Sequence, residues 1–271
     1  MNKYTPKLTK NKFIDYLRPH MPTGGGGLIG EGEERELNDV GLILSLSGAG
    51  CFFSSLSDLL TLSGPVWPEI EDLDTSQDIT EIGEIFKANG SDKAGPHHRY
   101  DLVYQSVFDD LKTKQSINIL EIGLGTNNTD TVSHMGYNAR PGASLYAYRD
   151  FFPQANIFGA DVDKRILFES ERIKTTYVDQ LRSETFKSMH RHLGEPELDL
   201  FIEDGLHSVS ASLNSLNYAI SVTKKNGYII LEDLYIPQRI WQSLCLLLDS
   251  YFNFQSIKIV NSGGSMLVIK V

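Results

Sequence analysis

Short apolar runs alternate with longer amphipathic stretches over the second part of the chain. The runs are rich in Ile, Leu, Val, Phe and Tyr, and most close on an acidic residue. Five are present, at residues 117–125, 156–163, 173–180, 198–204 and 227–234. This pattern is typical of strands buried on both faces of a parallel sheet, with functional groups at their carboxyl ends.

The stretches between these runs have helical periodicity. Between residues 209 and 220, apolar residues recur at steps of four, three and four, which places them on one stripe of a helix. Strand, helix and strand in this order require right-handed crossovers. Two further β-rich runs, 254–260 and 265–271, flank the turn residues 261–264, so a hairpin should end the chain. The sequence therefore predicts an α/β fold: a doubly wound, mostly parallel, seven-stranded sheet with an antiparallel hairpin at its C-terminal end.

The first part of the chain is organised differently. Residues 21–34 contain four consecutive glycines and are loop-like, and residues 63–78 carry two prolines among acidic residues. Residues 82–111 have a helical pattern with a break at 89–96. We expect residues 1–81 to form a partly flexible N-terminal extension and residues 82–271 to form the main domain. The polar break is either a helix-capping loop or a lid over a ligand.

Bulk properties narrow the class of protein. The net charge of −10 and the pI near 5.2 make duplex nucleic acid an improbable substrate, because phosphate binding requires a basic surface. No apolar run approaches the ~20 residues of a membrane span, and the start lacks a signal-peptide core. We therefore expect a cytoplasmic protein without nucleic-acid or membrane partners, and leave open whether it is a homo-oligomer. Cys51 and Cys245 lie in apolar settings and are interpreted as buried small residues.

The first apolar run leads directly into a glycine turn. Gly123 and Gly125 follow Glu121, and such a turn opens backbone N–H groups at the carboxyl edge of a sheet, where nucleotide-like ligands bind. Asp161, at the end of the next run, could accept hydrogen bonds from both ribose hydroxyls. A short-chain dehydrogenase would share these features. However, none of the twelve tyrosines is followed four residues later by the Lys that those enzymes use.

Three acids should meet at the ends of the last two parallel strands. Asp204, Glu232 and Asp233 would repel one another unless they were protonated or bridged by a cation, and hard carboxylate oxygens suit Mg²⁺. The alternative is structural: Glu232 caps a helix or pairs with Arg239, and Asp204 bonds a turn. His207 lies three residues after Asp204, on the opening turn of the next helix, where a neutral imidazole could act as a base.

The ordered motifs resemble a known family. Residues 91–93, 121–125, 142–145, 149–153, 159–163, 179–180, 204–207 and 232–234 together are similar to the metal-dependent sugar O-methyltransferases of macrolide-antibiotic biosynthesis, a group of class I S-adenosylmethionine methyltransferases. The likeness covers residues 82–271. One departure is Leu206, where relatives often carry a small polar residue.

The resemblance implies an activity and a set of site residues. The activity is S-adenosylmethionine- and Mg²⁺-dependent methylation of a hydroxyl on a sugar or glycosylated metabolite. A catechol-type O-methyltransferase remains an alternative, because Tyr146, Tyr148, Tyr235 and Trp241 could line either pocket, and a dinucleotide-binding oxidoreductase is a more distant one. The implied roles are Mg²⁺ ligation by Asp204, Glu232 and Asp233, general base for His207, and cofactor binding by Glu121, Gly123, Gly125, Ser144, Asp161, Asp179 and Gln180.

Overall fold

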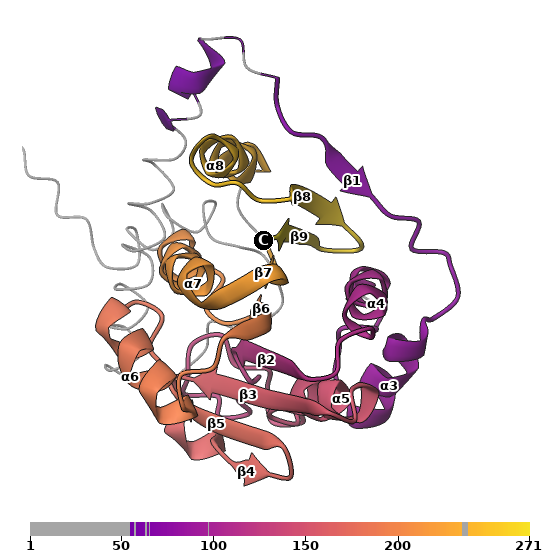
Figure 1. Cartoon of the computed structure of the whole chain (residues 1–271). Coiled ribbons are helices and arrows are strands. Elements are labelled where there is room, and N and C mark those ends of the chain that lie inside the picture. Colours follow the sequence, from indigo (N-terminus) through magenta and orange to yellow (C-terminus); the bar gives the residue numbers. More distant parts are fainter. Residues whose placement is uncertain (1–54, 57, 63, 65, 97, 235–237) are drawn as a thin grey trace, which may run out of the picture.

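A single sheet of nine strands organises the described chain. The computed structural model describes residues 55–271 apart from 57, 63, 65, 97 and 235–237. The strand order is β1-β8-β9-β7-β6-β2-β3-β5-β4 (Figure 1). The seven central strands are β2 (Ile117–Ile122), β3 (Ala155–Asp161), β5 (Ile173–Tyr177), β6 (Leu198–Glu203), β7 (Thr223–Leu231), β8 (Ser256–Asn261) and β9 (Ser265–Lys270). Among the central strands, β9 runs antiparallel to both its neighbours and the other pairs are parallel. The predicted fold, with its C-terminal hairpin, is confirmed.

The sheet has two more strands than predicted, one at each edge. β4 (Glu169–Ser170) pairs antiparallel with β5, and β1 (Ile70–Asp72) pairs parallel with β8. β1 comes from the segment assigned to the N-terminal extension. Its acids contact β8, with Glu71 bound to Lys258 at 3.0 Å and Asp72 accepting from Asn261 at 2.8 Å. Sequence periodicity could not find strands of two or three residues, because their positions depend on pairing with distant partners.

Helices cover both faces of the sheet. One face carries α3 (Glu81–Asn89), α4 (Tyr100–Leu111) and α5 (Ala143–Phe151), and the other carries α6 (Ser183–Leu193), α7 (Val209–Val222) and α8 (Gln238–Tyr251) (Figure 1). A short 3₁₀ turn, η2 (Lys164–Ile166), follows β3. The predicted break between the first two helices is confirmed, because α3 ends at a left-handed Gly90 and α4 starts at Tyr100. None of the helices in the described ranges is long and apolar enough to cross a bilayer.

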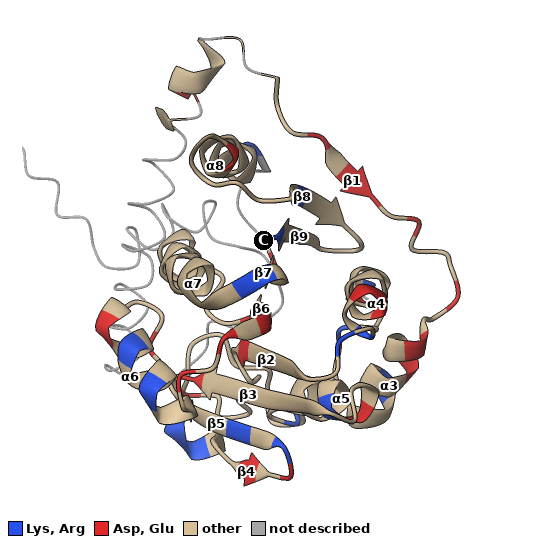
Figure 2. Ribbon diagram, in the orientation of Figure 1, with Lys and Arg blue, Asp and Glu red and all other residues tan. Residues whose placement is uncertain are grey.

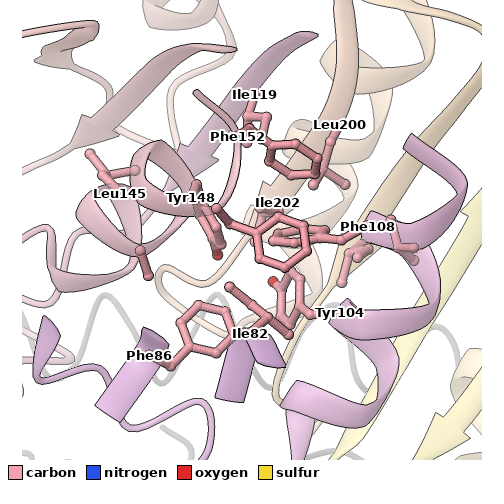
Figure 3. Close-up of a cluster of buried hydrophobic side chains, with 14 of the residues drawn as sticks. Ile82, Phe86, Tyr104, Phe108, Ile119, Leu145, Tyr148, Phe152, Leu200 and Ile202 are labelled. Atoms are coloured by element: carbon pink, nitrogen blue, oxygen red, sulfur yellow. The ribbon is translucent and has the colours of Figure 1, made fainter. Parts of the chain in front are cut away.

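The core on the α3–α5 face is built from aromatic side chains. The ring of Phe108 lies 5.5 Å from Tyr104 and 5.8 Å from Tyr148, and Phe86 packs edge-on against both tyrosines (Figure 3). Edge-to-face packing of this kind favours one relative orientation of the helices. Helix α4 is therefore fixed against the sheet, and the residues before it are fixed near the sheet's carboxyl edge.

Charge is distributed unevenly over the ribbon. Figure 2 shows Lys and Arg on α6, β5 and β7, whereas the two edge strands, β1 and β4, carry acidic residues. Acidic side chains on a short edge strand disfavour pairing with another chain. The four-glycine loop at 21–34, Cys51 and Tyr235 lie outside the described residues. Cys245 is buried, as expected, and burial raises the pKa of its thiol to about 12.

Candidate active site

Two neighbouring strand ends bring three polar side chains together. Asp204 follows β6, Asp233 follows β7, and a ligand atom of each lies within 4.8 Å of the others and of His207. The imidazole Nε2 of His207 is 3.9 Å from Asp204 Oδ1 and 3.8 Å from Asp233 Oδ2. His207 and Asp233 both have a left-handed backbone, with φ of 53°. Non-glycine residues in that conformation are uncommon and occur often at functional sites.

His207 lies slightly outside the position expected from sequence. Helix α7 begins at Val209 and is capped by Ser208, whose Oγ accepts from the backbone N–H of Ala211. His207 is therefore in the loop before the helix instead of on its first turn. The side chain still lies at the edge of the sheet, with its Nε2 3.9 Å from Asp204 Oδ1.

A buried lysine lies beneath this cluster. Lys93, from the segment between α3 and α4, is 3 % exposed, and its Nζ lies 2.5 Å from Asp204 Oδ2 and 2.7 Å from Glu232 Oε2. Glu121 Oε1 is 3.7 Å from the same nitrogen. Burial lowers the pKa of Lys93, but the three carboxylates outweigh burial and hold that pKa well above its usual value. Lys93 is therefore a protonated cation inside an acidic cluster.

Two tyrosines of α4 hold the acids that follow β7. The hydroxyl of Tyr104 donates to Glu232 Oε1, and the hydroxyl of Tyr100 donates to Asp233 Oδ1. The ring of Tyr100 also stacks on His98, at 4.8 Å between centroids. A Cβ on Gly264, in the β8–β9 turn, would lie 2.1 Å from the Tyr100 hydroxyl, so only glycine fits there. The hairpin turn thus packs directly against the group that positions Asp233.

The structure brings together only part of the predicted metal set. Glu232 is not in the group of Asp204, His207 and Asp233: it is 2 % exposed, its Oε1 accepts from Tyr104, and its Oε2 accepts from Lys93, which also binds Asp204. The carboxylate oxygens of Asp204 and Asp233 fit a divalent cation that completes its shell with water or hydroxyl oxygens, and the His207 imidazole lies beside them. The two aspartates therefore suit Mg²⁺.

The glycine turn is fastened to the end of the neighbouring strand. Asp161 accepts from Leu124 N–H at 2.7 Å and from Asp163 N–H at 2.8 Å, and it is 7 % exposed. Burial raises the pKa of Asp161 despite these two hydrogen bonds. Gly123 has φ of 94°, and a Cβ there would lie 1.9 Å from the carbonyl oxygen of Asp204. The turn therefore packs backbone to backbone against the loop that carries Asp204.

A second carboxylate at this strand end belongs to a network not expected from sequence. Asp163 accepts from Thr126 at 2.6 Å, from Asn128 at 2.8 Å and from Arg165 at 2.7 Å. Burial alone would raise the pKa of Asp163, but these donors hold it well below its usual range. Arg165 also binds Asp130, at the rim of a 390 Å³ pocket lined by Asn127, Asn128, Thr129, Asp130, Tyr137 and Arg165. The pocket is next to the glycine turn.

Glu121 and Ser144 face each other inside the domain. The Ser144 hydroxyl donates to Glu121 Oε1 at 2.8 Å, and Glu121 is 1 % exposed. Burial raises the pKa of the Glu121 carboxyl to about 7, although Lys93 acts in the opposite direction. Glu121 thus links the glycine turn to the buried lysine.

Gln180 is directed into the protein. Its Nε2 donates to Glu203 at 2.7 Å and to Ser215 at 2.9 Å, and its Oε1 accepts from Leu206 N–H at 2.9 Å. Asp179 accepts from the backbone N–H of Leu181 at 3.0 Å. The Gln180 amide therefore shapes the 204–207 loop, and the adenine role implied by the resemblance remains a prediction for both residues.

Several residues at the site were not assigned a role from sequence. Lys93, Tyr100 and Tyr104 belong to a segment identified only as a polar loop or lid and the helix after it. The available signal was the density of polar groups at residues 90–100 just before an apolar helix. Their partners lie more than a hundred residues away in sequence, for example 139 residues between Lys93 and Glu232. Trp241, considered as a pocket residue, is buried in the core of the α6–α8 face.

Comparison with known proteins supports the resemblance seen in the motifs. No family model matches the chain. It is 26% identical over 166 residues, 61% of its length, to an 8-demethyl-8-(2-methoxy-alpha-L-rhamnosyl)-tetracenomycin-C 3'-O-methyltransferase of Streptomyces olivaceus. It is also 26% identical over 157 residues, 57% of its length, to a mycinamicin VI 2''-O-methyltransferase of Micromonospora griseorubida. These matches cover 38% and 36% of the relatives, so the chain spans less than half of their length.

A solved structure has the same fold. The MycE methyltransferase of the mycinamycin biosynthetic pathway, in complex with Mg and SAH, matches 71% of this chain and 55% of its own with a TM-score of 0.58 at 20% identity. The predicted similarity to sugar O-methyltransferases and the class I methyltransferase fold are both confirmed.

Proposed function

We propose that this chain forms the catalytic domain of an S-adenosylmethionine- and Mg²⁺-dependent O-methyltransferase that acts on a hydroxyl of a sugar or glycosylated metabolite. The observation that carries the proposal is the convergence of Asp204, Asp233 and His207 beside the glycine turn at the carboxyl edge of the sheet. In α/β folds, ligands bind at this edge. The similar proteins named above, which methylate sugars in antibiotic pathways, support the choice of reaction.

The cofactor would lie along the glycine turn. Gly123 and Gly125 have φ of 94° and 71°, so the backbone at the turn can approach a ligand without a side chain between them. We place the methionine part near Glu121 and Ser144 and the ribose near Asp161. Each Asp161 oxygen already accepts one backbone N–H but keeps a further lone pair for a hydroxyl. The cofactor supplies the methyl group on a sulfonium, so no covalent intermediate with the protein is required.

The acceptor would bind at the acidic cluster. Asp204 and Asp233 would hold Mg²⁺, which when bound lowers the pKa of a coordinated hydroxyl. His207 would remove the proton of the reacting hydroxyl at Nε2, the nitrogen that faces both carboxylates. The remaining contribution of the protein is alignment: Tyr100 fixes Asp233 and Lys93 fixes Asp204, so the acceptor oxygen is presented in one orientation.

A turnover assay tests this function. The chain would be incubated with S-adenosylmethionine, Mg²⁺ and two acceptor sets, deoxysugar glycosides with adjacent hydroxyls and planar catechols, and S-adenosylhomocysteine would be measured. We expect product only with the glycosides. Turnover of catechols alone would replace the sugar acceptor with a planar diol. Heat of binding with NAD but none with S-adenosylmethionine would overturn the methyltransferase assignment.

A further inference from the structure

The carboxylate of Asp233 lies between two histidines. Nε2 of His207 is 3.8 Å from Asp233 Oδ2. Nδ1 of His98 is 4.0 Å from the other oxygen, Oδ1, which also accepts the hydrogen bond from Tyr100. His98 belongs to the segment before α4 and has no role in the proposed function. An acceptor bound at the acidic cluster would therefore meet a second imidazole beside Asp233.

Aromatic packing and the hairpin turn hold the His98 ring in place. The ring stacks on Tyr100, with 4.8 Å between the centroids and 30° between the ring planes. In the β8–β9 turn, a Cβ on Gly264 would lie 3.1 Å from His98 Nδ1 and 2.1 Å from the Tyr100 hydroxyl. The turn thus approaches both rings closely, and the packed ring has little freedom to leave Asp233.

The backbone next to His98 is anchored at several points. The Arg99 guanidinium donates to the carbonyl oxygens of three residues in the segment 75–78, at 2.6, 2.9 and 3.1 Å, and to the buried carboxylate of Asp101 at 2.9 Å. The backbone N–H of Arg99 donates to the carbonyl oxygen of Ser262 at 2.8 Å. His98 is therefore preorganised for binding, because little conformational freedom is lost when a ligand arrives.

The nitrogen atoms of His98 are left for a ligand. Nδ1 is buried and makes no hydrogen bond to any residue that the structure describes, which is unusual for a buried polar atom. The side chain is 23 % exposed, close to the 24 % of Asp204. Because Nδ1 is buried, the exposed part belongs to the rest of the side chain, which includes Nε2. A carboxylate beside Nδ1 favours the proton on that nitrogen, and this leaves Nε2 as a hydrogen-bond acceptor.

We propose that His98 binds the acceptor sugar: its Nε2 accepts a hydrogen bond from the hydroxyl on the carbon next to the reacting one, while Nδ1 directs its proton toward Asp233. His207 faces the reacting hydroxyl, so the group that faces His98, across one carboxylate, is the neighbour of that hydroxyl on the ring. The proposal rests on the proposed function, because it assumes a sugar at the acidic cluster. It names a substrate class, sugars whose neighbouring hydroxyl is free, since a methoxyl or a hydrogen there cannot donate.

Acceptor binding tests the proposal without turnover. Dissociation constants of methyl glycosides of hexoses and 6-deoxyhexoses would be measured by saturation-transfer NMR, with S-adenosylhomocysteine and Mg²⁺ present. The glycoside that binds the wild type most tightly would then be compared with its monodeoxy analogues, each lacking one ring hydroxyl.

Three substitutions at His98 separate its two nitrogens. His98→Phe keeps the stacked ring without a nitrogen, His98→Gln places an amide near the position of Nε2, and His98→Asn places one near Nδ1. His192→Phe, at an exposed position near the end of α6, is the matched control.

The expected pattern is specific to a contact with one hydroxyl. His98→Phe should weaken binding of the parent glycoside by about 3- to 10-fold, the value of one neutral hydrogen bond. It should bind one monodeoxy analogue as tightly as the wild type does, because that analogue lacks the hydroxyl that His98 contacts. His98→Gln should recover most of the affinity and His98→Asn should not. Affinity for S-adenosylhomocysteine and for Mn²⁺, a reporter of the metal site, should be unchanged in every variant, and His192→Phe should match the wild type.

A merely structural role for His98 would give a different pattern. His98→Phe would then weaken binding of the parent glycoside and of every analogue by the same factor, or would lower Mn²⁺ affinity, and either result would overturn the proposal. Equal binding of the parent glycoside by the wild type and His98→Phe would overturn it too. Recovery by His98→Asn instead of His98→Gln would move the contact to Nδ1 and overturn the role of Nε2. If His98→Phe does not fold, the opposite expectations for Gln and Asn decide the question.

Failure of the proposed function is distinguishable from failure of this proposal. In that case the wild type would bind the glycoside but release no S-adenosylhomocysteine when it is supplied with S-adenosylmethionine, and the comparison of His98 variants would still be made by binding. No binding of any glycoside in the set would overturn both.

Discussion

The carboxyl edge of the sheet has two halves that are held in different ways. In the glycine half, at the ends of β2, β3 and β5, Asp161 accepts from backbone N–H groups, and the Gln180 amide bonds the Leu206 N–H, the Ser215 hydroxyl and the Glu203 carboxylate. In the acidic half, at the ends of β6 and β7, Asp204 and Asp233 face each other across His207 and are tied back by Lys93 and Tyr100.

The difference between the two halves predicts how each should respond to substitutions, to pH and to cations. Hydrogen bonds to backbone groups fix a shape, and losing one mainly costs stability. A concentration of charge responds to cations, to pH and to substitutions that alter the local charge. We therefore expect variants of the acidic half to change activity much more than stability, and variants of the glycine half to change both.

Metal removal should have the largest effect. Activity should fall below detection in EDTA and return with Mg²⁺, because Asp204 and Asp233 would then lose the cation that they share. The Asp233→Asn variant should stay inactive at Mg²⁺ concentrations that saturate the wild type. The measurement is S-adenosylhomocysteine release by metal-checked protein. Full turnover in chelator would mean that the acidic half works without a metal.

His207→Ala should come next in size. Loss of a general base should reduce the single-turnover methylation rate by about 10²–10⁴-fold while Mg²⁺ affinity stays near the wild-type value. The Nε2 atom also lies within ligand distance of the cluster, so metal affinity must be measured in parallel. A joint loss of metal binding and activity would identify His207 as a ligand.

Glu121→Gln should change the pH dependence of stability. The folded-state pKa of Glu121 is about 7, raised from 4.5 by burial, so the folded protein retains a proton that the unfolded chain releases between these values. This preferential protonation of folded Glu121 adds to the free energy of unfolding below pH 4.5, and the added stability is lost as the pH rises through 7. The wild type should therefore lose on the order of 3 kcal/mol across this window relative to Glu121→Gln.

Urea denaturation at several pH values measures this slope. Glu84→Gln, on the exposed side of α3, is a control that should follow the wild type. Parallel curves for the wild type and Glu121→Gln would place the Glu121 titration outside this range.

Asp161→Ala should have the smallest effect on the protein but affect two properties at once. The N–H groups of Leu124 and Asp163 lose their acceptor, which should lower the free energy of unfolding by about 1–3 kcal/mol. Cofactor affinity, measured by calorimetry, should fall as well because the ribose loses a carboxylate. Asp130→Ala, an exposed acid on the same side, is the control. An unchanged free energy of unfolding would contradict the anchoring role of Asp161.

The sequence by itself determined the main elements and their order. The apolar runs and the periodicity of α7 were visible because each element buries a local face, and local faces leave a local pattern. The same holds for the polar ends of β6 and β7: parallel strands place their carboxyl ends at one edge, so Asp204 and Asp233 could be expected to meet. The similarity of the motifs to sugar O-methyltransferases was visible at the same level.

Only the tertiary structure determined which buried polar and charged side chains pair with one another. Lys93 and Glu232 are far apart in sequence, and nothing in either segment indicates that the two side chains are buried in contact. The same is true of Tyr100 and Asp233, and of the two short edge strands. Contacts of this kind arise from the packing of α4 against the sheet, and packing depends on the whole core at once. The fold as a whole therefore determines the partners of a buried charge, whereas the local sequence indicates where a strand ends.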